Sequence, residues 1–353
     1  MKRLEGVELL KYLCQIQGPT GSEERVAAAI REQLSDLDRI EITGDKGGNL
    51  IVAYTGEHHA ARVMVSAHMD EVGMMINDIT DDGYIKFACL GGIDPRVLCG
   101  RGVTLMGEAG DIPGVIASKA IHHQTADERR TATTADKMYI NIGAENKEEA
   151  QKHVAIGDSA TFRAEFYEFG NGLLCGKAID DRLGCAVMIE VLRRLVDGGV
   201  KLPYDVYFCF TTREEIGLSG AQTAAQSIGP NVAIVLESTA VADIAGVKDN
   251  SRVAKLGEGG AVSLADRSTI YDKALIDYAF DTAKKNDIKA QIKKYISGGN
   301  DAGHIHKSGR GVRSLAISAP TRYLHSASCV ASAADFESIK QLVYAMLCGG
   351  KLA

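Results

Sequence analysis

The segment Asp205-Val-Tyr-Phe-Cys-Phe-Thr211-Thr-Arg-Glu214-Glu215-Ile-Gly217 joins an apolar run to two adjacent glutamates and a glycine turn. The run 205–211 is hydrophobic at nearly every position, which is typical of a strand covered on both faces of a sheet. Open α/β sheets hold their ligands at the carboxyl ends of such strands. The segment therefore predicts a buried strand that delivers two carboxylates to one edge of a sheet.

Apolar runs of the same kind recur along the chain and alternate with helical periods. The further strand-like runs are Asn49–Thr55, Arg62–Ser66, Val232–Leu236 and Ser314–Ser318. The helical periods are Gly21–Leu37, Cys185–Val196, Thr269–Asn286 and Phe336–Leu347. Thr20 and Glu23 are spaced like a capping box at the start of the first of these helices. The alternation predicts an α/β fold, with a mixed, mostly parallel sheet flanked by helices.

The middle of the chain has a different texture. Between Glu71 and Phe166 the apolar runs are short, separated by turns, and accompanied by no long helical period. Examples are Tyr84–Ala88, Val103–Met106, Gly114–Ile116 and Asp158–Phe166. This pattern predicts a small β-barrel-like domain at 71–166, inserted into an α/β domain made of 1–70 and 167–353. The polar stretch 127–136 is expected to be a mobile loop within the insertion.

Composition excludes several classes of partner. The 353 residues carry 40 Lys and Arg against 46 Asp and Glu, a net charge of −6, without a basic run. Nucleic acids and anionic membranes are therefore not expected as partners. The sequence contains no run of about 18 apolar residues, so no membrane span is predicted. The N-terminus is typical of an amphipathic helix rather than a signal peptide. The eight cysteines are scattered without a C-x-x-C pair, which favours reduced thiols and a cytoplasmic location.

Residues of metal-ligand type follow several of the predicted strands. His68 ends one strand. Asp70 is placed to accept a hydrogen bond from the ring nitrogen of His68 that would not bind a metal. Asp180 precedes a helix, whose N-terminal dipole favours a carboxylate. Glu214 and Glu215 follow the run 205–211, where one glutamate can bind a metal while its neighbour acts as a general base.

Glu237 ends a further apolar run, and His325 lies shortly after the last one. Taken alone, each motif also fits a surface histidine, a helix cap or an exposed acidic turn. Together, His68, Asp180, Glu215, Glu237 and His325 supply two imidazoles and three carboxylates from separate strand ends. This set predicts a two-metal site for zinc, cobalt or manganese rather than calcium.

Five motifs occur in order along the chain, namely SAHMDEVG at 66–73, KAIDDRLGC at 177–185, TTREEIGLSGA at 211–221, SGGNDAGHIH at 297–306 and RYLHS at 322–326. In these motifs the sequence resembles the glutamyl/tetrahedral (TET) aminopeptidases, a family of dinuclear-metal peptidases. The resemblance implies a zinc-aminopeptidase-like fold, two Zn or Co ions per chain, and hydrolysis of N-terminal residues from short peptides.

The resemblance also implies a role for each site residue. His68 and Glu237 would bind one metal, Glu215 and His325 the other, and Asp180 would bridge them. The catalytic residues would be Glu214, as the general base for a hydroxide activated by both metals, and Asp70, which orients His68. A cis peptide bond is expected after Asp180. Glu237 departs from the family pattern, in which aspartate is usual.

The resemblance further implies that 71–166 serves in dimerisation and that six dimers form a tetrahedral dodecamer. In this family a histidine of the insertion can reach a neighbouring subunit's site, which leaves the role of His122 and His123 open, whereas Cys329 is expected to be structural. Other functions remain open. Glu237 favours a deacylase or carboxypeptidase on the same scaffold, Asp180 and Glu214 as paired carboxylates would suit a glycosidase, and a non-enzymatic assembly or binding module is the last alternative.

Overall fold

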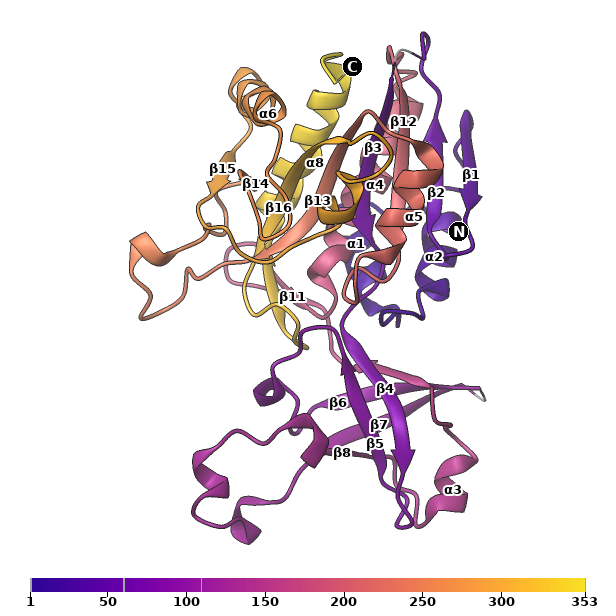
Figure 1. The fold of residues 1–353 in the computed structure, drawn as a ribbon, viewed down its shortest axis with the longest axis vertical. Helices are drawn as coiled ribbons and strands as arrows, with labels where there is room; N and C mark the ends of the chain where they lie inside the picture. Colours follow the sequence, from indigo (N-terminus) through magenta and orange to yellow (C-terminus); the bar gives the residue numbers. More distant parts are fainter. Residues whose placement is uncertain (1, 60, 109, 353) are drawn as a thin grey trace.

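The computed structural model describes residues 2–59, 61–108 and 110–352, which form an α/β core with a barrel beneath it (Figure 1). The core contains one eight-stranded sheet. Its spatial order is β1 (Ile40–Gly44), β2 (Leu50–Tyr54), β12 (Asp205–Thr211), β3 (Arg62–His68), β13 (Val232–Ala240), β16 (Arg313–Thr321), β14 (Gly260–Ser263) and β15 (Ala290–Lys293). The central pairs β12–β3, β3–β13 and β13–β16 are parallel, and β1–β2, β2–β12 and β16–β14 are antiparallel. The predicted α/β class with a mixed sheet is confirmed.

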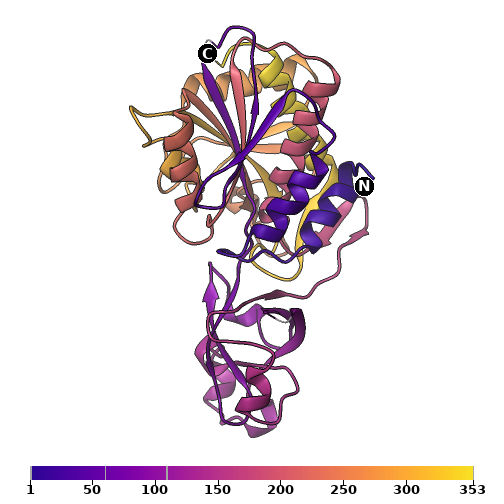
Figure 2. The ribbon, with the colours of Figure 1, turned by 90° about the vertical axis from the view of Figure 1, so that its right-hand side faces the viewer.

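Helices cover both sides of the sheet (Figure 2). The long helix α4 (Ile179–Asp197) packs on β3 and β13, and α8 (Ala333–Cys348) packs beside it on β16 and β14. The other helices of the core are α1 (Gly6–Gln15), α2 (Glu24–Gln33), α5 (Ser219–Ile228), α6 (Lys273–Lys285) and α7 (Ala302–Ile305). No helix of the described residues is long and apolar enough to cross a membrane.

The apolar runs became strands for the reason that the sequence suggests. The side chains of Val206, Phe208 and Phe210 in β12 are fully buried, because this strand lies between β2 and β3 inside the sheet. Some of the predicted runs were too short: β16 continues past Ser318 to Thr321, and β13 continues past Leu236 to Ala240. The polar residues at its end stay in the sheet because they pair in register with β16.

The middle segment folds as a closed six-stranded barrel with its own apolar core. Its strands are β4 (Gly73–Ile79), β5 (Ile85–Leu90), β6 (Gly102–Gly107), β7 (Gly110–Ala117), β8 (Tyr139–Asn141) and β9 (Ser159–Phe162), and the barrel also carries the short helix α3 (Lys147–Gln151). The predicted polar loop at 127–136 contains two short 3₁₀ turns, Glu128–Arg130 and Ala135–Lys137. The β-barrel-like nature of the insertion is thereby confirmed.

A small sheet that the sequence did not reveal links two segments far apart in the chain. It consists of β10 (Tyr167–Phe169), β11 (Leu173–Gly176) and β17 (Cys329–Ser332). Pairing of β11 with β17 sets Gly176 opposite Cys329. The residues that follow β11 are thus held next to those that precede β17, which brings Asp180 close to His325.

The predicted capping box at Thr20–Glu23 is wrong. Helix α2 begins at Glu24, so Glu23 occupies the N-cap position and makes no side-chain cap hydrogen bond. The hydroxyl of Thr20 has no hydrogen-bond partner among the described residues. The carboxylate of Glu23 instead accepts hydrogen bonds from the amides of Gly21 and Arg213. A contact across the fold has therefore replaced the local one.

Arg182 anchors the start of α4 to the N-terminal segment. Its guanidinium is completely buried and donates hydrogen bonds to the carbonyls of Met69, Leu13, Ile16 and Gly18. We expect Arg182→Met to lower the free energy of unfolding by about 3–5 kcal/mol, because it removes four buried charge-assisted hydrogen bonds and leaves the Met69 carbonyl without another partner among the described residues. Denaturant unfolding of the variant measures this loss.

The matched control is Arg310→Met, at an exposed position whose side chain makes no hydrogen bond or ion pair with the described residues. It should change stability by less than about 0.5 kcal/mol. A loss below about 1 kcal/mol for Arg182→Met would contradict the anchoring role.

Candidate metal centre

All five predicted metal ligands come together beside the carboxyl ends of the central strands. His68 is the last residue of β3, and Glu215 lies four residues beyond the end of β12. Glu237 lies within β13, whereas Asp180 belongs to the first turn of α4 and His325 to the loop between β16 and β17. The prediction that Glu237 ends its strand is wrong, because β13 is longer than expected.

Asp180 stands between the two histidines. One carboxylate oxygen, Oδ1, lies 3.3 Å from Nε2 of His68, and the other, Oδ2, lies 3.4 Å from Nε2 of His325. Each imidazole nitrogen also faces a glutamate. Nε2 of His68 is 3.4 Å from Oε1 of Glu237, and Nε2 of His325 is 3.4 Å from Oε2 of Glu215. The side chains thus form two imidazole–glutamate groups that share one aspartate.

This donor set fits two divalent cations. Two ligand atoms held about 2.0–2.1 Å from one zinc ion at a tetrahedral angle are about 3.4 Å apart, which is the spacing seen in both groups. Within the described residues, no lysine or arginine lies within 4.0 Å of these carboxylates. Buried carboxylates without a cationic partner are costly, and bound metal ions would supply the missing positive charge.

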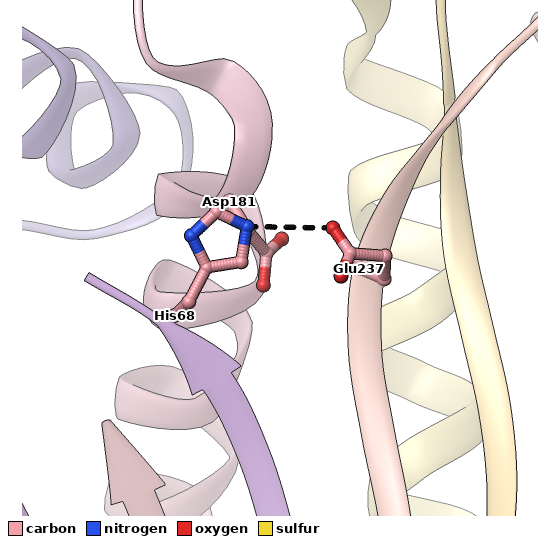
Figure 3. A group of neighbouring side chains, drawn as sticks. All are labelled: His68, Asp181 and Glu237. Atoms are coloured by element: carbon pink, nitrogen blue, oxygen red, sulfur yellow. Dashed lines mark ion pairs between the residues drawn. The ribbon is translucent and has the colours of Figure 1, made fainter. Parts of the chain in front are cut away.

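Asp181 is a candidate ligand that the sequence analysis did not assign. Figure 3 shows it beside His68 and Glu237, with which it forms one of the two groups able to hold a metal; the other is Asp180, Glu215 and His325. Asp181 is completely buried, and its Oδ1 accepts a hydrogen bond of 3.0 Å from the amide of Gly184. Its Oδ2 has no hydrogen-bond partner among the described residues, and neither has Oε2 of Glu237. The sequence feature that could have indicated Asp181 as a ligand is its position directly after Asp180. The peptide bond between these two residues is cis, as expected.

The crowding of carboxylates shapes their proton affinities. Burial, followed by the charge of Asp180, raises the pKa of both Glu215 and Glu237 to about 8. Burial opposes ionisation of Asp180 as well, but hydrogen bonds to His325 and His68 outweigh it and hold the pKa of Asp180 well below its usual value. The site therefore has a strong preference for added positive charge, whether protons or cations.

Comparison with known proteins identifies the family to which this fold belongs. The family model described as M42 glutamyl aminopeptidase matches residues 48–342. The chain belongs to this family. A lysyl aminopeptidase of Pyrococcus furiosus is 30% identical over 349 residues, which cover 96% of each chain. The M42 assignment confirms the resemblance drawn from the five sequence motifs, and it makes this chain a member of a family of aminopeptidases.

Solved structures agree with the M42 assignment. A TET aminopeptidase of a marine-sediment Thaumarchaeota archaeon superimposes with a TM-score of 0.94 at 36% identity, covering 98% of this chain and 96% of that one. The TET1 peptidase of Pyrococcus horikoshii gives a TM-score of 0.86 at 35% identity, covering 97% and 98%. That protein is described as able to assemble into a tetrahedron or a large octahedral shell.

Asp70 contacts the ring nitrogen of His68 that faces away from the candidate metal centre. Nδ1 of His68 lies 3.0 Å from the Asp70 carbonyl oxygen and 3.4 Å from its carboxylate Oδ1. The same carboxylate accepts hydrogen bonds of 3.1 Å from the amides of Glu214 and Glu215. Asp70 thus contacts both a candidate ligand and the turn that carries the two glutamates. The carbonyl oxygen, rather than the carboxylate, is the closer partner of the His68 ring.

Glu214 lies next to the candidate ligand Glu215 but belongs to neither metal-binding group. Its side chain is partly buried, and no side-chain hydrogen bond or ion pair is recorded for it among the described residues. Burial, followed by the charge of Glu237, raises the pKa of Glu214 well above the usual glutamate value. A carboxylate in this state is suited to taking up a proton near neutral pH.

The barrel also contributes to the candidate metal centre, through a glycine pair that the sequence analysis missed. The carbonyl of Gly92, just beyond β5, lies 3.0 Å from Nδ1 of His325 and fixes the orientation of that ring. A Cβ atom at Gly92 would lie 3.3 Å from the same nitrogen, and one at Gly91 would lie 3.2 Å from Oε2 of Glu215. Only glycines allow the barrel to approach the ligands this closely, and Gly91 also has a positive φ of 88°.

The remaining sequence candidates lie outside the two metal-binding groups. His122 and His123 form an exposed 3₁₀ turn on the barrel, within Ile121–His123. Cys329 is buried at the start of β17, and its thiol lies 3.5 Å from the carbonyl oxygen of Ser326. The reach of the two histidines toward another subunit and the structural role of Cys329 stay predictions.

Proposed function

We propose that this M42 family member is a two-metal aminopeptidase that removes N-terminal residues from short peptides. The observation that carries the proposal is the position of Asp180, whose two oxygens each face one imidazole, one beside Glu237 and the other beside Glu215. His68 and Glu237 would hold one ion and Glu215 and His325 the other, with Asp180 shared. Zinc or cobalt suits this mixed nitrogen and oxygen donor set, and manganese is a further candidate.

The chain's own side chains define the reaction. When bound, a metal pair lowers the pKa of a water molecule and polarises the scissile carbonyl. Glu214 takes a proton from the attacking water on its carboxylate and delivers it to the leaving amine. Asp70 holds the His68 ring and the Glu214 amide in place. A free α-amino group keeps a nitrogen lone pair that an acylated nitrogen has lost to its carbonyl, so only the free N-terminus would bind to one of the two cations.

We also propose that the barrel insertion, residues 71–166, serves in dimerisation and that the chain forms a homo-oligomer, with a tetrahedral dodecamer as the expected assembly. The assembly described for the Pyrococcus horikoshii TET1 peptidase supports this. A closed shell would admit only short or unfolded peptides. We place the chain in the cytoplasm, because all eight cysteines are free and five of them are buried.

Substrate pairs test the proposed reaction. The zinc- or cobalt-loaded protein should hydrolyse aminoacyl chromogenic amides, fail on the matched N-acetylated amides, and lose its activity in a chelator. Cleavage of the N-acetylated amides would instead support a deacylase. Release of C-terminal residues from N-blocked peptides would support a carboxypeptidase. Sugar hydrolysis that persists in chelator would favour a glycosidase, and a protein that binds no metal and cleaves none of these substrates would favour a binding module.

A further inference from the structure

The turn that carries Glu214 and Glu215 is held by four consecutive backbone amides. The amide of Thr212 donates to Oδ1 of Asn49 at 3.0 Å, and that of Arg213 donates to Oε1 of Glu23, also at 3.0 Å. The next two amides donate to the carboxylate of Asp70. Three side chains from three separate segments thus fix residues 212–215, immediately beyond the end of β12.

Glu23 is the unexpected member of this set. It is only 4% exposed, and no lysine or arginine of the described residues forms an ion pair with it. Its Oε1 instead accepts from two backbone amides, those of Gly21 at 2.8 Å and Arg213 at 3.0 Å. Burial of a carboxylate without a cationic partner is costly. No cap hydrogen bond to helix α2 offsets this cost, because the Glu23 side chain makes none.

The backbone of Arg213 shows what the Glu23 contact accomplishes. Arg213 has a φ of 56°, a left-handed conformation that costs a residue other than glycine about 1–2 kcal/mol. Its side chain is exposed, with no hydrogen bond or ion pair recorded for its guanidinium among the described residues. The hydrogen bond from its amide to Glu23 is therefore the one hydrogen bond that Arg213 itself makes among the described residues, and it supports the left-handed conformation together with the bonds of the flanking amides. Relaxation of Arg213 would rotate the peptide that leads into Glu214.

We propose that Glu23 is a positioning residue, whose carboxylate acts through the Arg213 amide to aim the Glu214 and Glu215 side chains at the metal centre. This inference rests on the proposed function for the roles of those two glutamates. It adds a residue outside the range 48–342 that the family model matches. The contact joins positions 190 residues apart in the chain, so the N-terminal segment would control the geometry of the reactive turn.

Glu23→Met tests the proposal, because methionine keeps the length of the side chain and removes both acceptor oxygens. We expect kcat to fall by about 10- to 100-fold with KM little changed, since small misplacements of a catalytic group cost this much. The zinc affinity of the group containing Glu215 should weaken by about 10- to 100-fold, as it does when the support of a ligand is lost. Deuterium exchange of the peptide covering 212–217 should become faster.

Glu23→Gln is the rescue variant. Its amide oxygen can accept the same two hydrogen bonds without carrying a charge, so kcat, zinc affinity and deuterium exchange should stay close to the wild-type values. Glu24→Met is the matched control, at the neighbouring exposed position in the first turn of α2. It should leave all three measurements unchanged.

Three results would overturn the proposal. In the first, Glu23→Met gives the same kcat, zinc affinity and deuterium exchange as Glu24→Met. In the second, Glu23→Met lowers only the unfolding temperature, and in the third, Glu23→Gln loses as much in these measurements as Glu23→Met. If Glu23→Met does not fold, Glu23→Ala is measured in its place. Its zinc affinity and deuterium exchange are then compared with those of Glu23→Gln. Both of these measurements are independent of peptide turnover. A wild-type protein without aminopeptidase activity would therefore refute the proposed function separately from the positioning role.

Discussion

Glu214→Gln is expected to lower kcat on an aminoacyl amide by about 10²–10⁴-fold, the usual contribution of a general base. Glutamine has nearly the same shape as glutamate but cannot take up the proton of the attacking water. Glu214 belongs to neither group of candidate ligands, so the variant should still bind two metal ions per chain. Steady-state kinetics, with metal content measured on the same preparation, check both halves of this expectation.

The neighbouring residue provides the contrast for this experiment. Glu215 faces His325 at 3.4 Å and belongs to one of the two metal-binding groups. Glu215→Gln should therefore lose activity together with one metal ion, whereas Glu214→Gln loses activity alone. If Glu214→Gln kept most of its turnover, or if both variants lost metal equally, the assignment of the base would be wrong.

The sequence analysis placed the candidate ligands together more accurately than it placed the ends of the strands around them. Apolar runs that are followed by ligand-type residues identified His68, Glu215 and Glu237. Strands inside a sheet must be hydrophobic, whereas the residues at their ends need not be. The same rule placed the end of β13 too early, at Leu236. Ser238 and Thr239 remain in the sheet by pairing with β16, and that contact depends on a partner far along the chain.

The features that were missed share this long-range origin. Gly91 and Gly92 meet the ligands only because the barrel folds back against the core. Glu23 looked like part of a local capping box, whereas its carboxylate reaches Arg213 across the fold. For Glu23 a one-dimensional pattern singled out the residue but could not show its partner, and for the glycine pair the sequence analysis found no pattern at all. Asp181 differs, because its pairing with Asp180 was visible and only its burial next to His68 and Glu237 shows that it faces the site.

Asp180→Ala is expected to have the second large effect, the loss of metal binding at both positions. Each oxygen of Asp180 faces a different imidazole, so one substitution removes the carboxylate that the two imidazole–glutamate pairs share. Loss of a residue that merely supports a ligand costs about 10- to 100-fold in metal affinity, and loss of the shared aspartate should cost more than that. Zinc titration by calorimetry and the metal content after dialysis measure the effect.

Thermal unfolding gives a reading of the same loss that is independent of turnover. A ligand bound only by the folded state stabilises it by about 2.7 kcal/mol at 100 times its dissociation constant. Zinc should therefore raise the unfolding temperature of the wild-type chain much more than that of Asp180→Ala. Asp197→Ala is the control, at the far end of the same helix, where an exposed ion pair with Arg3 contributes at most about 1 kcal/mol. Equal zinc-induced shifts in the wild type and Asp180→Ala would show that the metals, if they bind, do not share this aspartate.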